Sequence, residues 1–270
     1  MSDIYRLEHG TTPLVVSVPH AGTIVPAAIA GRLTAAGRAL PDTDWHVDRL
    51  YGFARGLGAS LLVATHSRYV IDVNRPPDDA PLYRGRRVTG LCPVTTFDGE
   101  PIYLEGEAPE AAEVGDRRAR FWEPYHACLR RELEVVRRRF GVALLFDAHS
   151  IRSEIPSLFP GRLPELNLGT GGGSSAGTEL TTRIAAVLAA TEAYSSVVNG
   201  WFKGGHITRE YGNPSGGVHA VQLELAQRGY MREGPPAEPD ADRARRLEPV
   251  LSMVLGAMLE WAGGVRTYDS

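Results

Sequence analysis

Cysteine is scarce in this sequence, with only Cys92 and Cys128 among 270 residues. Two distant cysteines indicate neither a disulfide scaffold nor a cysteine metal site, so we expect a protein of the reducing cytoplasm. The amino terminus lacks a basic segment followed by an apolar run, so we expect no signal peptide. No stretch approaches the ~20 apolar residues of a membrane helix, so we expect no membrane partner.

A strong excess of either charge is also missing, because the formal net charge is only -3. No global field therefore attracts nucleic acid, and any attraction for an acidic ligand must come from locally placed arginines. Hydrophobic residues make up 43% and charged residues 23%, as in an ordinary globular protein. With no internal repeat and no linker, we expect one domain over residues 1–270.

Short apolar runs rich in β-branched residues indicate strands of a sheet that is covered on both faces. These runs are Leu14–Val18, Ser60–Ala64, 69–73, 142–146 and 220–225. Helical spacing of apolar residues predicts helices over 116–140, 178–190 and 241–261. Strands that alternate with helices predict an α/β layered fold. Segments rich in proline or glycine, at 72–109, 161–177 and 201–217, are expected to be long loops.

Two histidines occupy matching positions, each directly after a predicted strand. His20 follows Leu14–Val18, and His149 follows the strand at 142–146. A single such histidine is usually a hydrogen-bonded core residue, but two of them near carboxylates suggest a metal site with three protein ligands. Asp44, His46 and Asp48 could each supply the third ligand, and we choose Asp48. The alternative is that the aspartates cap a helix or face solvent.

Glu224 lies within an otherwise apolar predicted strand and shares a face with Gln222. A buried unpaired carboxylate is costly. The residue therefore either pairs with an arginine or serves as a general base with a shifted pKa, and the residues alone leave both readings open.

Four arginines are candidates for binding a carboxylate, because the guanidinium group forms a planar two-toothed fork. Arg68 and Arg75 flank the predicted strand at 69–73, and Arg152 follows His149. Arg209 lies with His206 in the glycine-rich segment 201–217, and we include His206 among the candidate substrate ligands. Most arginines of a protein face solvent. We select these four because they lie near the ends of predicted strands.

Five segments in order resemble the N-formylglutamate amidohydrolase family, the deformylases of histidine breakdown. They are SVPHAGTIVP, DTDWHVDRLY, SRYVIDVNRP, FDAHSIRSEIP and FKGGHITREYGNPSGGVHAVQLELAQRGYM, and they span about residues 14–231. The family is similar to zinc carboxypeptidases and aspartoacylases. This resemblance implies a three-layer α/β/α sandwich with a mixed central sheet, and one divalent metal, for which zinc is the expected ion.

The resemblance also implies residue roles. Aspartoacylases carry Arg-Tyr leading into Asp-Leu-Asn-Arg, which matches Arg68-Tyr69 leading into Asp72-Val73-Asn74-Arg75. By this match Arg68 polarises the scissile carbonyl, while Asn74 and Arg75 hold a substrate carboxylate. Glu224 matches the catalytic glutamate of the carboxypeptidases. The sequence departs from those relatives after His20, where their usual metal-binding glutamate is missing, and Asp48 is the expected substitute.

The resulting expectation is metal-dependent hydrolysis of N-formyl-L-glutamate to formate and L-glutamate. Glu224 would move the proton, and Arg75, with Arg152 or Arg209, would neutralise the substrate carboxylates. Two alternatives stay open. The chain could hydrolyse another acyl amino acid, such as an N-acyl-aspartate or a carboxy-terminal peptide residue, or it could bind acidic metabolites without catalysis.

Overall fold

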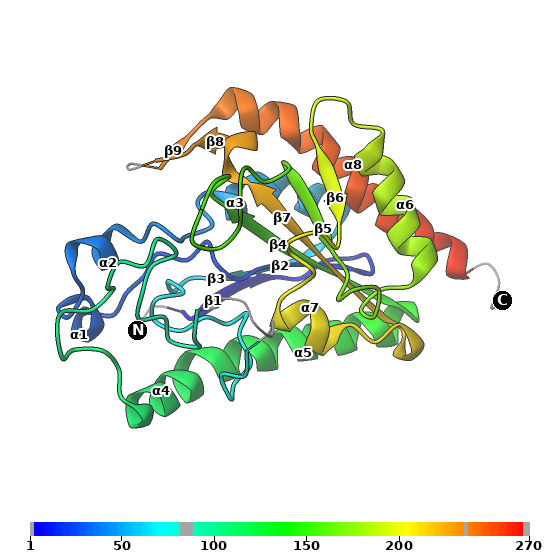
Figure 1. Ribbon diagram of the computed structural model, residues 1–270. Coiled ribbons are helices and arrows are strands. Elements are labelled where there is room, and N and C mark those ends of the chain that lie inside the picture. Colours follow the sequence, from blue (N-terminus) through cyan, green and yellow to red (C-terminus); the bar gives the residue numbers. More distant parts are fainter. Residues whose placement is uncertain (1–2, 82–88, 235–236, 267–270) are drawn as a thin grey trace.

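A mixed seven-stranded sheet forms the centre of the molecule (Figure 1). The computed structural model describes residues 3–81, 89–234 and 237–266. The strand order is β1-β3-β2-β4-β7-β5-β6; β1 is antiparallel to β3 and β5 to β7, whereas the other neighbours are parallel. The strands are β1 (Tyr5–Glu8), β2 (Leu14–Val18), β3 (Ser60–Ala64), β4 (Ala143–Ile151), β5 (Leu166–Gly169), β6 (Ser196–Val198) and β7 (Val218–Ala226). A separate two-stranded sheet contains β8 (Met231–Arg232) and β9 (Glu238–Pro239).

Helices cover both faces of the central sheet, with α5 on one side and α6 and α8 on the other (Figure 1). The α-helices are α1 (Ala27–Ala30), α2 (Ala35–Ala39), α3 (Val47–Leu50), α4 (Ala111–Arg117), α5 (Glu123–Phe140), α6 (Thr178–Ala189), α7 (His206–Tyr211) and α8 (Ala241–Arg266). Shorter helical turns are η1 (Tyr51–Leu57), η2 (Arg118–Trp122), η3 (Pro214–Gly216) and η4 (Gln227–Gly229). This arrangement confirms the expected three-layer α/β fold with a mixed sheet.

The alternation of side chains along β2 divides the core into two layers. Leu14, Val16 and Val18 pack in the same cluster as the buried residues of α6 and α8. Val15 points to the opposite face and packs in the cluster of α5. Every residue of β2 is buried, which explains why the run is continuously apolar rather than alternating.

Several sequence-based boundaries need correction. Residues 69–73 form turns instead of a strand, because Val70 N donates to Ser67 O at 2.8 Å and Asp72 N donates to Leu91 O at 2.7 Å. The strand expected at 142–146 continues to Ile151, so His149 lies within it. The expected loops at 161–177 and 201–217 contain β5 and α7, respectively. Residues 82–88 of the expected loop 72–109 lie outside the described residues.

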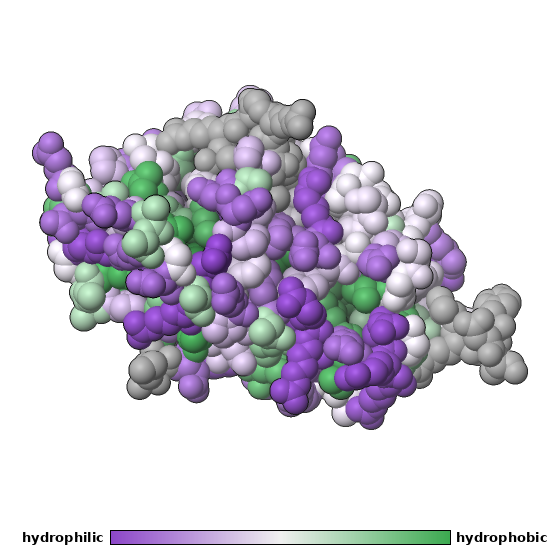
Figure 2. All heavy atoms as spheres, turned by 90° about the horizontal axis from the view of Figure 1, so that it is seen from below, coloured by the Kyte–Doolittle hydropathy of each residue, from purple (hydrophilic) through white to green (hydrophobic). Residues whose placement is uncertain are grey.

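The face on the α5 side is largely hydrophilic, with apolar side chains in separate small groups (Figure 2). Exposed arginines of α5 account for part of this character: Arg130, Arg131, Arg137, Arg138 and Arg139. Among the described residues, no helix has the length and apolar character needed to cross a membrane.

Candidate active site

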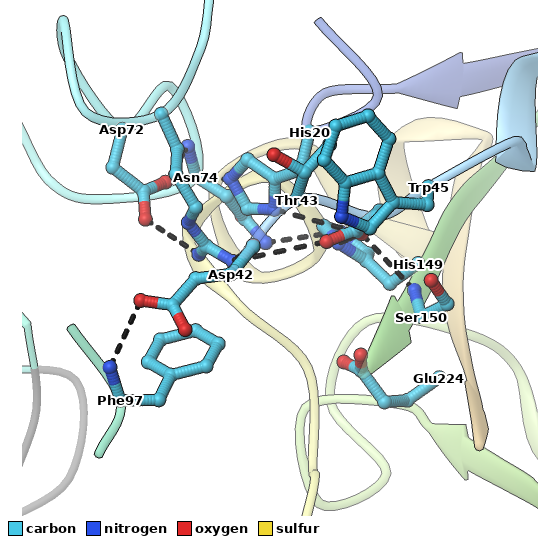
Figure 3. Close-up of polar contacts among 12 residues, drawn as sticks. His20, Asp42, Thr43, Trp45, Asp72, Asn74, Phe97, His149, Ser150 and Glu224 are labelled. Atoms are coloured by element: carbon cyan, nitrogen blue, oxygen red, sulfur yellow. Dashed lines mark hydrogen bonds and ion pairs between the residues drawn. The ribbon is translucent and has the colours of Figure 1, made fainter. Parts of the chain in front are cut away.

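The candidate site lies where three parallel strands carry polar side chains at their carboxyl ends. His20 follows β2, while His149 and Glu224 belong to β4 and β7. β4 pairs with both β2 and β7 in parallel, and His149 and Glu224 are Cα partners. Ligands of open α/β sheets bind at this edge. In Figure 3 the two histidine side chains approach each other, with the Glu224 carboxylate beneath them.

His20, Asp44 and His149 form a buried cluster of possible metal ligands. One ligand atom from each residue lies within 4.8 Å of the others. His149 Nδ1 is 3.2 Å and His20 Nδ1 is 3.8 Å from Asp44 Oδ2, and the two ring centroids are 4.9 Å apart. Ser150 N also donates to Asp44 Oδ2 at 3.0 Å, which fixes this carboxylate against the strand.

The opposite nitrogen of each histidine faces a second carboxylate. His20 Nε2 donates to Asp72 Oδ1 at 2.7 Å, and His149 Nε2 lies 3.0 Å from Asp147 Oδ2. Because a carboxylate only accepts hydrogen bonds, Asp72 favours a proton on His20 Nε2 and a lone pair on His20 Nδ1. His149 faces a carboxylate at both ring nitrogens, Asp44 at Nδ1 and Asp147 at Nε2. The Nδ1 of His20 is buried without a hydrogen-bond partner. Two imidazoles and one carboxylate that converge in a buried position fit a metal cation with nitrogen and oxygen ligands.

The charged groups around the cluster also favour a bound cation. Burial and the nearby Arg68 lower the pKa of His20, so its ring is neutral and able to bind a cation. Burial disfavours charge on His149 and Asp44 as well. For His149 the adjacent Asp147 carboxylate outweighs burial and raises its pKa well above the usual value, and the hydrogen bond with His149 lowers the pKa of Asp44. The carboxylates thus stabilise positive charge at this position.

Asp48, chosen from the sequence as third ligand, is not part of the cluster. Its Oδ2 atom pairs with Arg6 Nη2 at 3.0 Å, near the molecular surface. Asp44 and Asp48 would share one face only on a continuous helix, but α3 begins only at Val47. His46, which precedes it, has a left-handed φ of 64° that turns the chain. Asp44 takes the position that had been expected for Asp48.

Glu224 is buried in the same pocket and has no arginine among its hydrogen-bond partners in the described chain. Gln222 Nε2 donates to Glu224 Oε2 at 3.1 Å. Burial raises the Glu224 pKa to about 8, and Asp44 contributes to the rise. A carboxyl group with a pKa near neutrality can both accept and release a proton, which favours the general-base reading over a structural ion pair.

Arg68, Asn74 and Arg75 line the pocket together with the cluster and Glu224. The buried Asp72 carboxylate organises them: Arg68 Nη2 donates to its Oδ2 at 2.7 Å, and Asn74 N donates to its Oδ1 at 2.9 Å. Arg75 Nη2 donates to Thr89 Oγ1 at 3.0 Å. Burial opposes charge on Asp72, but Arg68 and His20 outweigh it and hold the Asp72 pKa well below its usual value.

The structure does not bring the three other candidate substrate ligands into the pocket lining. Arg152 Nη2 donates to Asp98 Oδ2 at 2.7 Å, toward the surface. His206 is buried at the start of α7, beside Trp122 and His126. Arg209 is exposed, and its Nε donates to Gly204 O at 2.9 Å.

One wall of the pocket is apolar and was not foreseen from the sequence. It consists of Phe97, Ile151, Leu158, Trp201 and Phe202. The Phe97 ring lies 5.0 Å from the Arg68 guanidinium carbon, and Phe97 N donates to Asp42 at 2.9 Å (Figure 3). Most of these side chains come from irregular segments without a periodic pattern. The sequence therefore predicted the polar residues of the pocket but not its apolar wall.

Known proteins match almost the whole chain. The family described as N-formylglutamate amidohydrolase matches residues 12–231. A protein named N-formylglutamate deformylase from Pseudomonas putida is 51% identical over 261 residues, covering 97% of both chains. A protein of the same name from Pseudomonas aeruginosa is 52% identical and covers 97% of this chain and 98% of its own.

Solved structures agree with this relationship. The crystal structure of an N-formylglutamate amidohydrolase from Ralstonia eutropha JMP134 superposes with a TM-score of 0.79 at 29% identity, covering 97% of this chain and 98% of its own. A gene product from Agrobacterium tumefaciens, 19% identical, shares the fold with a TM-score of 0.69, covering 95% and 96%. The chain belongs to the N-formylglutamate amidohydrolase family.

Proposed function

We propose that this protein hydrolyses N-formyl-L-glutamate to formate and L-glutamate. The observation that carries the proposal is the meeting of three groups in one pocket: the His20–Asp44–His149 cluster, the buried carboxyl of Glu224, and two arginines. The names of the two Pseudomonas relatives support the same substrate.

A divalent metal, for which zinc is our proposal, would be held by His20, Asp44 and His149. Two imidazoles and one carboxylate match a common donor set of catalytic zinc, and Asp72 and Asp147 orient the rings. When bound, the metal supplies Lewis acidity and lowers the pKa of water toward ~7.

Glu224 moves the proton in this scheme. Its carboxylate accepts a proton from the water that attacks the formyl carbon, and it gives that proton to the amide nitrogen as the C–N bond breaks. The proton is therefore conserved within the site, and formate and the free amine of glutamate leave. Arg68, which lines the same pocket, donates hydrogen bonds to the formyl oxygen as negative charge develops there.

Arg75 and Asn74 form the part of the pocket that we assign to the substrate carboxylates. Arg75 offers a guanidinium whose geometry matches a carboxylate, and its hydrogen bond to Thr89 limits its rotamers. Asn74 also lines the pocket, and its Nδ2 atom lies 3.1 Å from Nε2 of His149, a member of the candidate metal cluster. N-formyl-L-glutamate carries two carboxylates, and this negative charge matches the two arginines of the lining, Arg68 and Arg75.

Two measurements on purified protein test the proposal. Formate release from N-formyl-L-glutamate should exceed hydrolysis of N-acetyl-L-aspartate by a wide margin, and faster turnover of the acetyl compound would assign the chain to another acyl amino acid. Binding of glutamate without any turnover, in metal-loaded protein, would instead support a binding protein. The buried Glu224, which has no arginine hydrogen-bonded to it in the described structure, favours the enzyme.

A further inference from the structure

Gln222 connects Glu224 to the loop that leads into α7. Gln222 and Glu224 are two residues apart on β7, so both side chains leave the same face of the strand, and both line the pocket. Gln222 Nε2 donates to Glu224 Oε2 at 3.1 Å. Within the described parts of the chain, this is the only hydrogen bond to the Glu224 carboxylate.

The amide of Gln222 can take only one orientation. Gly205 N donates to Gln222 Oε1 at 2.7 Å, so the oxygen end of the amide is occupied. A flipped amide would place an NH₂ group against the Gly205 N–H, where donor would face donor, and would turn the amide N–H donor away from the Glu224 carboxylate. The amide nitrogen is consequently held toward Glu224.

Gly205 is itself fixed by Asn74. A Cβ atom added at Gly205 would overlap the Asn74 side-chain amide, so only glycine permits this close approach. The next two residues also bond to Asn74: His206 N donates to its backbone oxygen at 3.3 Å, and Ile207 N to its Oδ1 at 2.8 Å. Because Asn74 also contacts His149, a continuous path of short contacts runs from the histidine side of the pocket to Glu224.

We propose that Gln222 is a positioning residue, which holds the Glu224 carboxylate in one orientation and takes its own orientation from Gly205. The proposal rests on the proposed function, because a fixed carboxylate matters most if Glu224 transfers a proton. A buried acid that is free to rotate would spend part of its time away from the reacting water. Misplacement by about 1 Å can lower a rate ~10²-fold.

The test compares Gln222→Met with a matched control. Methionine fills a similar volume but cannot donate to Glu224, so kcat should fall about 10- to 100-fold. KM should change less than about threefold, and metal content should stay unchanged, because neither substrate carboxylates nor metal ligands are touched. The control is Asn167→Ala on β5, which removes a buried amide that donates to the backbone oxygen of Glu224 at 3.1 Å and not to its carboxylate. The control should lower the melting temperature and leave kcat near the wild-type value.

A crystal structure of the Gln222→Met protein provides a readout that does not depend on activity. Glu224 should show a rotated or multiply placed carboxylate, whereas the wild-type protein shows one. If the variant does not fold, Gln222→Asn, which keeps an amide but is too short to reach both partners, should give the same loss of kcat. An unchanged kcat with Glu224 in its original place would overturn the proposal. A wild-type protein that does not hydrolyse N-formylglutamate would instead contradict the proposed function, and the crystallographic comparison would still decide whether Gln222 orients Glu224.

Discussion

His149 on β4 and Glu224 on β7 are directly paired residues of neighbouring parallel strands. Their separation is therefore set by the backbone hydrogen bonds of the sheet centre, where both strands are almost entirely buried. The acid to which we assign proton transfer and a histidine of the candidate metal cluster are thus placed by the buried centre of the sheet. Sites on strands hold geometry better than sites on loops, and this property is what proton transfer to a reacting water requires.

The assignment of the third metal ligand is tested by removing each aspartate in turn. Asp44→Ala should lower zinc affinity by at least about tenfold, because even outer residues of metal sites change affinity 10–100-fold. Asp48→Ala is the matched control and should keep full occupancy, since Asp48 pairs with Arg6 outside the cluster. Zinc content is measured by mass spectrometry after dialysis. The reverse result would restore Asp48 as the ligand.

The role of Glu224 is tested by Glu224→Gln, which keeps the shape of the side chain but cannot accept a proton. We expect kcat to fall about 10²–10⁴-fold. The melting temperature should not decrease, because the hydrogen-bond partner of this carboxyl is the neutral amide of Gln222 and not an arginine. A destabilisation of ~3–5 kcal/mol, measured by urea unfolding, would show a buried ion pair instead.

Substrate charge is tested at Arg75, which lines the pocket. Loss of a hydrogen bond to a charged group costs ~1.5–3 kcal/mol, so Arg75→Ala should raise KM for N-formylglutamate roughly 10- to 100-fold. A smaller effect on N-formylglutamine would assign Arg75 to the side-chain carboxylate, whereas an equal effect would assign it to the α-carboxylate. Arg152→Ala serves as control, because Arg152 lies outside the lining and pairs with Asp98. An unchanged KM for both substrates would remove Arg75 from the site.

His126 provides a prediction about stability and pH. Burial lowers its pKa to about 3, while Tyr211 and the Val73 carbonyl bind the neutral ring. Between pH 6.5 and about 3 the unfolded chain binds a proton that the folded protein does not, so stability falls as the pH decreases through this window. From pH 7 to pH 5 this effect amounts to ~2 kcal/mol.

The comparison for this effect is His126→Gln, which keeps hydrogen-bonding groups but does not titrate. Other buried histidines act equally in both proteins and cancel. Urea unfolding at pH 7 and pH 5 should therefore show a smaller loss of stability for the variant. Parallel curves for the two proteins would show that His126 keeps an ordinary pKa in the folded state.

The central strands could be read from the sequence because burial on both faces leaves a continuous apolar run. β2 and β3 match their predicted bounds for this reason. Residues 69–73 have the same composition but form turns, because the Ser67 backbone and the segment near Leu91 supply their hydrogen bonds. The partner at Leu91 is close only in the folded chain, so composition cannot distinguish the two outcomes.

Within the site, His20, His149 and Glu224 were identifiable because each is a polar residue at the end of, or inside, an apolar strand. The choice between Asp44 and Asp48 could not be made from the sequence, because the left-handed turn at His46 between them has no strong signal for histidine. Asp147 contacts His149, and Gln222 contacts Glu224, two positions along the same strand, so side-chain alternation brings each pair together. The contact of Gln222 with Gly205 joins distant parts of the chain and could not be read from the sequence.

The buried Asp72 carboxylate, which binds His20 through one oxygen and Arg68 through the other, has a consequence for ligand binding. Any ligand that fixes Arg68 also restrains the carboxylate that orients His20. With the proposed metal bound at His20, we therefore expect positive heterotropic cooperativity, in which an anion such as glutamate raises the affinity for the metal and the metal raises the affinity for the anion. Thermodynamic reciprocity requires the two enhancements of affinity to be equal, so removal of the proposed metal should weaken binding of the product.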